Sequence, residues 1–293
     1  MTTQRTSEKC RPALFIGGGN MAAAIVRSGL RSGVLAAPST IVAEPEESRR
    51  AELSMLGIIA VPDATRGIES MLLIETAHHC HGMGAVVLAV KPQVLGTVAS
   101  TTPSLGSLGP RCFVSIMAGV TSARLAASLP APHDGSHRFV RVMPNLPISV
   151  GKGMTAIAQS ASIDAHDRDW TESLFASGGD TVVLPEELID AFTAVAGSGP
   201  AYVFYIAEAM ERAAQSVGFD AKTARAIVRQ TINGAASLLS DANTDPSALR
   251  QAVTSKGGTT HAACSVLDSS GVMEAFARAI VAARDRGREL SSG

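Results

Sequence analysis

The sequence has few aromatic residues and no surplus of basic charge, and both shortages narrow its range of partners. Phenylalanine, tryptophan and tyrosine make up 4% of the 293 residues, so platforms for stacking nucleic-acid bases are scarce. Lysine and arginine (25) nearly balance aspartate and glutamate (26), and no basic run is present to follow a phosphate backbone. We therefore expect no nucleic-acid partner.

Long hydrophobic runs and paired cysteines are lacking too. No stretch approaches the roughly 18 apolar residues that a membrane-spanning helix needs. The four cysteines, Cys10, Cys80, Cys112 and Cys264, show no CxxC spacing, which favours reduced thiols over a disulfide framework or a zinc site. The run His-His-Cys-His at 78–81 is interpreted as a loop, because adjacent residues do not easily converge on one ion. The sequence predicts a cytoplasmic protein without metal or membrane partner.

Hydrophobic residues make up 46% of the chain, which is enough for the cores of two domains. Short β-branched runs alternate with helix-like segments in the first part, the pattern of βαβ units around a parallel sheet. Strands are expected at 13–16, 41–43, 58–61, 86–90, 112–116, 139–143, 154–158 and 181–184. The predicted fold class is an α/β Rossmann-type N-terminal domain, residues 13–184, preceded by a flexible segment, residues 1–12.

After residue 185 helical signals take over, so residues 185–293 are predicted to form an all-α domain. Asp220 and Asp245 are expected as N-caps, Pro200 and Pro246 in first turns, and Gly218 as a stop. The helix from residue 200 carries no charge before residue 208, so we expect it to be buried between subunits. Helices are predicted at 186–196, 200–217, 221–240, 246–253, 260–267 and 272–290.

A dinucleotide fingerprint, G-x-G-x-x-A, follows the first strand and opens the next helix. It reads Gly17-Gly18-Gly19-Asn20-Met21-Ala22. In such a turn the first glycine permits a tight bend, the second lets the backbone approach a pyrophosphate, and the small last residue lets the helix pack closely. The flanking strand and helix strengthen the prediction of a bound dinucleotide.

The choice between NADH and NADPH stays open in the sequence. Glu44 ends the second strand, where a carboxylate can hold the ribose 2′-hydroxyl of NADH. Arg49 and Arg50 follow and could instead receive the 2′-phosphate of NADPH, although a solvated helix face also explains such a pair. The predicted cofactor is NADPH or NADH.

Three further turns are expected at carboxyl ends of strands, where ligands of open α/β sheets collect. One contains Val90, Lys91 and Pro92, and Lys91 could neutralise a phosphate or simply be solvated. The second, residues 115–119, is also expected to line the cofactor crevice. In the third, Asn145 could meet the nicotinamide amide or cap a turn.

A second candidate site is the stretch V-T-S-K-G-G-T-T at 253–260. Gly257 and Gly258 free the backbone to bend, and Thr259 and Thr260 stand where a new helix should begin. A helix start with unpaired N–H groups suits a small carboxylate. The alternative is a glycine hinge followed by a threonine N-cap.

Together these motifs resemble those of pyrroline-5-carboxylate reductases over nearly the whole chain. The matching stretches are F-I-G-G-G-N-M-A, A-V-K-P-Q, S-I-M-A-G-V-T, R-V-M-P-N, L-I-D-A-F-T-A-V-A-G-S-G-P-A-Y and V-T-S-K-G-G-T-T. The resemblance implies a helical domain that interlocks with its partner's, hence a homo-oligomer of at least two chains, with a decamer among the possible sizes. It also implies hydride transfer from NADPH or NADH to L-1-pyrroline-5-carboxylate, a cyclic imine, giving L-proline in the last step of proline biosynthesis.

The resemblance further implies roles for individual positions. Substrate contacts fall to Glu186, Gly258, Thr259 and Thr260, with the Thr260 hydroxyl, the candidate catalytic group, on the ring nitrogen and the turn's N–H groups on the carboxylate. Glu44 departs from the family pattern, because NADPH-preferring members carry a small hydroxyl residue there. Cofactor contacts fall to Ile16, Gly17, Gly18, Gly19, Asn20, Met21, Ala89, Val90, Lys91, Pro92, Met117 and Ala118.

Two other functions compete with this one. A β-hydroxyacid dehydrogenase shares the two-domain plan but places a lysine on the first interdomain helix, and here no lysine follows Gly199 before Lys222. A non-catalytic NAD(P)-binding scaffold would keep the fingerprint but gain nothing from Thr259 and Thr260.

Overall fold

The computed structural model describes residues 11–292 except residues 103, 133, 134 and 242. Cys10 and most of the predicted flexible segment therefore lie outside the described residues. Contacts divide the chain into two compact units: one runs to Gly197 and also includes the stretch from Ala283 onward, and the other is Ser198–Ala282.

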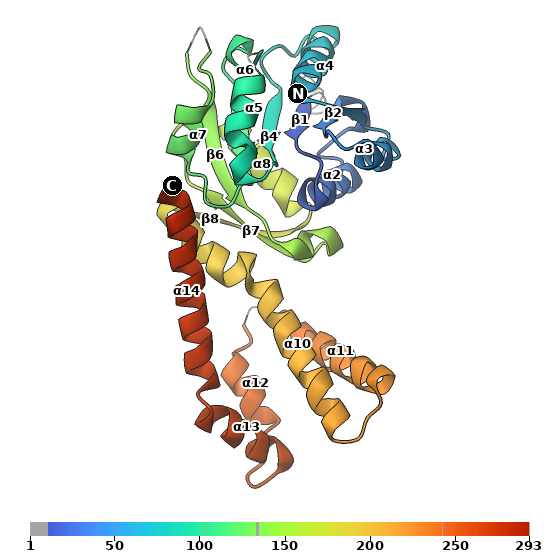
Figure 1. Ribbon diagram of the computed structural model, residues 1–293, viewed down its shortest axis with the longest axis vertical. Helices are drawn as coiled ribbons and strands as arrows, with labels where there is room; N and C mark the ends of the chain where they lie inside the picture. The colour runs from blue at the N-terminus through green and yellow to red at the C-terminus, as the bar shows by residue number, and fades with distance from the viewer. Residues whose placement is uncertain (1–10, 103, 133–134, 242, 293) are drawn as a thin grey trace. The chain divides into compact units, whose positions relative to one another are not determined.

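The first unit is built on one eight-stranded sheet (Figure 1). Its order is β3-β2-β1-β4-β5-β6-β7-β8, and neighbouring strands are parallel except β6 and β7. All eight predicted strands are present, with ends shifted by at most two residues. They are β1 (Ala13–Ile16), β2 (Thr40–Ala43), β3 (Ile59–Val61), β4 (Ala85–Leu88), β5 (Cys112–Ser115), β6 (Arg138–Met143), β7 (Gly153–Ala158) and β8 (Gly179–Leu184).

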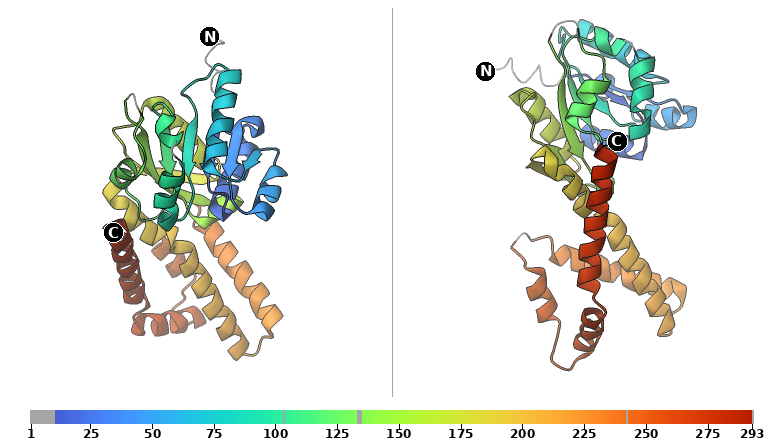
Figure 2. Two further views of the ribbon diagram at one scale, coloured as in Figure 1. Left: turned by 45° about the horizontal axis from the view of Figure 1, so that its top comes forward. Right: turned by 60° about the vertical axis from the view of Figure 1, so that its left-hand side comes forward.

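Helices cover both faces of this sheet, as the views in Figure 2 also show. Side chains alternate along each strand, so Phe15 packs into one core and its neighbour Leu14 into the other. The Phe15 face is covered by α2 (Asn20–Ser32), α3 (Glu47–Ser54) and α8 (Ala165–Ala176). The Leu14 face is covered by α4 (Ala64–Ala77), α5 (Leu95–Thr101), α6 (Ser104–Ser107) and α7 (Ser122–Ser128). Burial on both faces explains why the central strands are continuous apolar runs.

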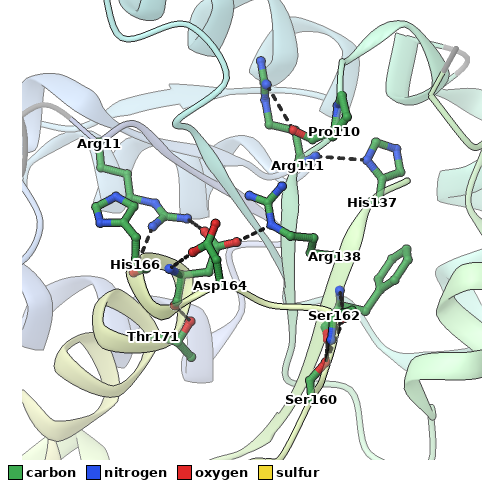
Figure 3. A network of polar contacts seen from close by, with 12 residues as sticks. Arg11, Pro110, Arg111, His137, Arg138, Ser160, Ser162, Asp164, His166 and Thr171 are labelled. Atoms are coloured by element: carbon green, nitrogen blue, oxygen red, sulfur yellow. Dashed lines mark hydrogen bonds and ion pairs between the residues drawn. The ribbon is translucent and has the colours of Figure 1, made fainter. Parts of the chain in front are cut away.

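Buried ion pairs occupy the amino ends of β1, β5 and β6 (Figure 3). Arg11 and Arg138 each lie 2.5 Å from a different oxygen of the Asp167 carboxylate. Burial would raise the pKa of Asp167, but hydrogen bonds from Arg138 and Arg11 hold it below its usual value. Burial also raises the pKa of Cys112 to about 12, so this thiol stays protonated. Ligands of open sheets bind at the opposite, carboxyl edge, so we assign this network to stability.

Residues 64–84, which include the run His-His-Cys-His, consist of α4 and a loop folded around Glu75. This carboxylate is 1% exposed and accepts hydrogen bonds from the backbone N–H groups of Gly82 and Gly84 and from Arg111. His79 in the loop takes a φ of 53°. Among the described residues no group of three or more His, Cys, Asp or Glu could hold a metal ion.

The segment after β8 is helical but is not the single helix that we predicted at 186–196. It forms a 3-10 turn η4 (Glu186–Leu188), a short α9 (Ile189–Phe192) and a π turn η5 (Thr193–Gly197). Packing against the sheet explains the difference, because Ile189 is fully buried beside β7 and Gly197 approaches the side chain of Met143. By its contacts this segment belongs to the first unit.

The second unit is helical. Asp220 and Asp245 cap α11 and α12 as predicted, and Gly218 has a φ of +109°. Phe204 and Tyr205 of α10, which we expected at a subunit interface, are 58% and 74% exposed in the single chain. No described helix is long and apolar enough to cross a membrane. Its helices are α10 (Gly199–Ser216), α11 (Ala221–Leu238), α12 (Pro246–Ala252), α13 (Thr259–Ser269) and the first part of α14 (Val272–Ser292).

Candidate active site

The glycine turn after β1 has the geometry that a dinucleotide needs. Gly17 has a φ of +103°, and a Cβ there would lie 2.7 Å from the carbonyl oxygen of Ala89, so only glycine fits. At Gly19 the space is open, since the nearest atom to an added Cβ is a guanidinium nitrogen of Arg49 at 3.8 Å. α2 begins directly afterwards with no side chain capping its first turn. A pyrophosphate can therefore approach Gly19 and meet unpaired N–H groups.

A cavity of about 460 Å³ adjoins this turn. Gly18, Asn20 and Met21 line it together with Arg49 and other residues of α2 and α3. The fingerprint is thus open to a ligand rather than filled by neighbouring side chains.

Glu44 lies beside the glycine turn, as predicted, but its carboxylate bonds to the chain itself. One oxygen accepts a hydrogen bond from the Gly18 N–H at 2.9 Å and the other from the Glu46 N–H at 3.0 Å. Arg50 donates to the carbonyl oxygens of Glu44 and Pro45, so it holds this loop. Arg49 pairs with Glu46 at 2.9 Å and remains 44% exposed. The loop thus presents a fixed negative charge, with the exposed cation of Arg49 nearby.

The other predicted cofactor residues follow β4 and β5. Ala89 donates its N–H to the carbonyl of Ile16 at 2.9 Å, which ties the two turns together. Lys91 is exposed, and Met117 donates its N–H to the Ser115 hydroxyl at 3.3 Å. Because β1, β4 and β5 are neighbouring parallel strands, the turns after them meet at one edge of the sheet. The structure therefore brings together Ile16–Met21, Ala89–Pro92 and Met117–Ala118.

The Asn145 side chain links two elements that are distant in sequence, and it makes no hydrogen bond that caps the 3-10 turn after it, so the capping role that the sequence left open is wrong. Its amide nitrogen donates to the carbonyl of Ala196 at 2.9 Å, and its amide oxygen accepts from the Met154 N–H at 2.9 Å. With only 7% of the residue exposed, both ends of the amide are occupied by the chain. Asn145 fastens the π turn η5 to β7, so we do not assign it to the nicotinamide.

Glu186 is hydrogen-bonded to the start of α7, close to the turn after β5. Its carboxylate accepts a hydrogen bond from the backbone N–H of Ser122 at 2.7 Å. Ser122 opens α7 immediately after the loop that carries Met117 and Ala118. Of the residues predicted to contact the substrate, Glu186 is the one in the first unit.

Sequence reasoning missed a buried ion pair next to Glu186. Arg141 in β6 is 2% exposed and lies 2.5 Å from the carboxylate of Asp190. A signal was available, because an arginine in an otherwise apolar buried strand needs a carboxylate partner. The sequence does not indicate which carboxylate that is.

Gly258, Thr259 and Thr260 lie in the second unit, at the start of α13. Gly257 has a φ of +73°, and Gly258 is the N-cap, so the alternative of a threonine N-cap is wrong and the helix begins one residue earlier than predicted. A Cβ at Gly258 would collide with the Ser255 hydroxyl. Neither threonine hydroxyl bonds to another described residue, so both remain available to a ligand beside the unpaired N–H groups of the first turn.

Two family models match the chain. Residues 186–290 match the model described as pyrroline-5-carboxylate reductase dimerisation. Residues 13–119 match the model described as NADP oxidoreductase coenzyme F420-dependent. Together they cover both the sheet edge with the fingerprint and the helices with the threonine turn.

Full-length relatives agree with these models. The pyrroline-5-carboxylate reductase of Haemophilus influenzae is 35% identical over 283 residues, 95% of this chain and 97% of its own length. That of Synechocystis is 35% identical over 279 residues, covering 94% and 97%. The solved structure of the Coxiella burnetii reductase has a TM-score of 0.82 at 32% identity, covering 96% and 99%. A Plasmodium falciparum pyrroline carboxylate reductase solved with NADP bound shares the fold, with a TM-score of 0.78 at 22% identity over 97% and 99%.

Proposed function

The chain belongs to the pyrroline-5-carboxylate reductase family, and from that membership we propose which of its residues carry the chemistry. It is an NAD(P)H-dependent oxidoreductase that reduces L-1-pyrroline-5-carboxylate to L-proline, the last step of proline biosynthesis. The observation that carries this conclusion is the 35% identity along nearly the whole length of curated reductases.

The dinucleotide lies along the carboxyl edge of the sheet in this proposal. The turn at Gly17–Gly19 receives the pyrophosphate, and the turns at Ala89–Pro92 and Met117–Ala118 line the rest of the cleft. The open space at Gly19 and the unpaired N–H groups of α2 support this assignment. When bound, the reduced nicotinamide supplies the hydride. We assign cofactor binding to residues 13–184, and substrate binding and dimerisation to 185–293.

Glu44 makes NADH the preferred cofactor in this proposal. The N–H groups of Gly18 and Glu46 hold its carboxylate, so the negative charge cannot easily turn away. A 2′-phosphate placed beside it would be repelled, whereas a ribose hydroxyl can donate a hydrogen bond to it. Arg49 opposes this effect only weakly, because it is largely exposed and paired with Glu46.

From the family membership we assign substrate binding to Glu186 in the first unit and to the turn before α13 in the second unit. The Thr260 hydroxyl bonds to the ring nitrogen and orients the C=N bond, while Thr259 and the N–H groups after Gly258 receive the carboxylate. A hydroxyl is a poor acid near neutral pH, so water or an already protonated imine supplies the proton. Positioning therefore dominates the rate, because it makes hydride transfer effectively unimolecular.

The chain forms a homo-oligomer through its dimerisation region. We infer at least a dimer, and a decamer is the larger assembly to test. Light scattering on the intact protein distinguishes a dimer, with twice the 30.1 kDa mass of one chain, from a decamer, with ten times that mass. We also propose a cytoplasmic enzyme, since Cys112 and Cys264 are free thiols and reducing compartments keep thiols in that state.

A single assay tests the function against its two competitors. The intact protein is given the pyrroline, then a six-membered cyclic imine, then a hydroxy acid, each with reduced or oxidised cofactor as the reaction requires, and nicotinamide absorbance is followed. We expect oxidation of NADH with the pyrroline. Activity with the hydroxy acid alone would favour a β-hydroxyacid dehydrogenase, and silence with all three would leave a binding scaffold.

A further inference from the structure

The segment that begins with Glu186 is anchored to the sheet about one helical turn further along. Ile189 is fully buried in a cluster with Ala156 and Ala158 of β7. The next residue, Asp190, keeps only 13% of its side chain exposed. The position of Glu186 therefore depends on how this anchor is held.

Asp190 joins two elements that are distant in sequence. Arg141 of β6 lies 2.5 Å from one carboxylate oxygen. The Ser291 hydroxyl in the last turn of α14 lies 3.1 Å from one oxygen of the same carboxylate and 3.3 Å from the other, and its one proton is shared with the carbonyl oxygen of Gly287 at 3.0 Å. One turn earlier in α14, Gly287 packs on Asp190, since a Cβ there would lie 3.4 Å from the Asp190 Cβ. The carboxylate is thus the meeting point of β6, α9 and the end of α14.

The buried charge of Arg141 holds β6 against the Asp190 carboxylate of α9. Its side chain is 3% exposed, and Asp190 is its only ion-pair partner among the described residues. A buried guanidinium without a partner is costly, so the pair stays together. The segment from Glu186 to Phe192 consequently cannot slide along the sheet without leaving Arg141 uncompensated.

At its amino end the same segment is hydrogen-bonded close to the turn after β5, one of the turns predicted to bind the cofactor. Glu186 accepts the Ser122 N–H at 2.7 Å, directly after the loop that carries Met117 and Ala118. Such a hydrogen bond weakens steeply with small displacements. The position of the Glu186 carboxylate is therefore set by Ser122 on one side and by Asp190 on the other.

We propose that Asp190 is a positioning residue for the reduction, which through Arg141 and Ser291 fixes where Glu186 meets the cyclic imine. The inference rests on the proposed contact between Glu186 and the substrate. In this proposal Thr260 orients the C=N bond for hydride transfer and Glu186 only adds to the binding of the imine, so the loss of Asp190 weakens ground-state and transition-state binding of the imine alike. Such a loss raises KM for the imine and leaves kcat and the cofactor KM unchanged.

The first test is Asp190→Asn in the full-length protein, which keeps the size of the side chain and removes its charge. We expect KM for the pyrroline to rise about tenfold, with kcat and the NADH KM within about twofold. The matched control is Asp167→Asn, which breaks a buried arginine–carboxylate cluster at the amino edge of the sheet. It should lower the melting temperature and leave all kinetic constants unchanged. An imine KM that is the same in both variants and in the unmodified chain overturns the proposal.

A double-mutant cycle tests whether Asp190 acts through Glu186. In a Glu186→Ala background, Asp190→Asn should add less than about twofold to the imine KM, because the residue being positioned is already absent. If Asp190→Asn raises the imine KM in this background by the same factor as in the unmodified chain, the proposal is overturned. Should Asp190→Asn not fold, Ser291→Ala removes one hydrogen bond and keeps the ion pair, and an unchanged imine KM in that variant also overturns it. Failure of the unmodified chain to oxidise NADH with the pyrroline would instead refute the proposed function, and that measurement precedes every variant.

Discussion

The carboxylate of Glu44 accepts a hydrogen bond from the backbone N–H of Gly18 at 2.9 Å, across the turn that the cofactor must approach. A Cβ at Gly18 would lie 2.9 Å from the Cβ of Glu44, so the middle glycine of the turn is what lets the two residues approach so closely. The contact fixes a negative charge beside the cleft before any ligand arrives.

Replacing Glu44 by serine should shift cofactor preference towards NADPH. The variant removes the fixed charge that repels the 2′-phosphate and supplies a hydroxyl that can bond to it. We expect the ratio of kcat/KM for NADPH to that for NADH to rise by about tenfold or more, the effect of about 1.4 kcal/mol. Steady-state kinetics with both cofactors and saturating pyrroline measure it. Glu52→Ser, which removes a carboxylate from the wall of the cavity that adjoins the glycine turn, is the control. An unaltered ratio in Glu44→Ser would remove Glu44 from cofactor selection.

Gly19→Ala should weaken cofactor binding without destabilising the fold. Gly19 has an ordinary φ of −64°, and an added methyl group meets no protein atom closer than 3.8 Å. The methyl would occupy the space through which the pyrophosphate approaches, so we expect the dissociation constant for NADH to rise at least about tenfold. Titration calorimetry gives the binding constant, and urea denaturation gives the free energy of unfolding.

Gly33→Ala is the converse control for that experiment. Gly33 ends α2 with a φ of +78° and open space around it, so alanine there is strained by roughly 1 kcal/mol. It should lower the free energy of unfolding and leave NADH binding unchanged. Equal NADH binding by Gly19→Ala and the unmodified chain would contradict the placement of the pyrophosphate.

Local patterns were sufficient to predict the eight strands of this fold but not the partners of its side chains. The strands stand out because burial on both sheet faces demands β-branched runs, and Asp220 was found because capping depends on adjacent residues. Arg141 and Asp190, by contrast, are 49 residues apart, and no local pattern pairs them. The π turn at Thr193–Gly197 likewise receives a hydrogen bond from Asn145, 51 residues earlier than its partner Ala196.

Thr260→Ala should lower turnover with little change in cofactor binding. The hydroxyl bonds to no described residue, so removing it breaks no contact within the chain and leaves the helix start intact. We expect kcat for the pyrroline to fall about tenfold, the effect of one lost hydrogen bond to the reacting nitrogen. Steady-state kinetics and circular dichroism on the same preparation measure turnover and folding.

Thr260→Ser provides the matched rescue, because it restores the hydroxyl and omits only the methyl group. Its turnover should return to within about twofold of the unmodified enzyme. Unchanged turnover in a correctly folded Thr260→Ala protein would show that another group orients the imine.

His137 should make the protein less stable as the pH falls below about 6.5. The ring is 6% exposed, its Nδ1 accepts the N–H of Arg111, and its Nε2 lies 3.2 Å from the carbonyl oxygen of Pro130. Burial lowers the pKa of His137 below its usual value of 6.5, despite the opposing effect of the hydrogen bond to Pro130. The unfolded chain therefore takes up this proton at a higher pH than the folded chain does. The stability is complete above the unfolded pKa and is lost as the pH falls towards the folded one.

Replacing His137 by glutamine should remove that loss, because an amide can still accept from Arg111 and donate to Pro130 but does not titrate. Urea denaturation at pH 7.5, 6.5, 5.5 and 5.0 should show a decline in the unmodified protein of at most about 1.4 kcal/mol per pH unit from this one proton. The decline should be reduced in His137→Gln, even if its stability at pH 7.5 is lower. Asp167 does not contribute in this range, because its pKa is lowered from 3.8 and its stabilisation is lost only in more acidic solution. The same decline in both proteins would assign the acid sensitivity to another group.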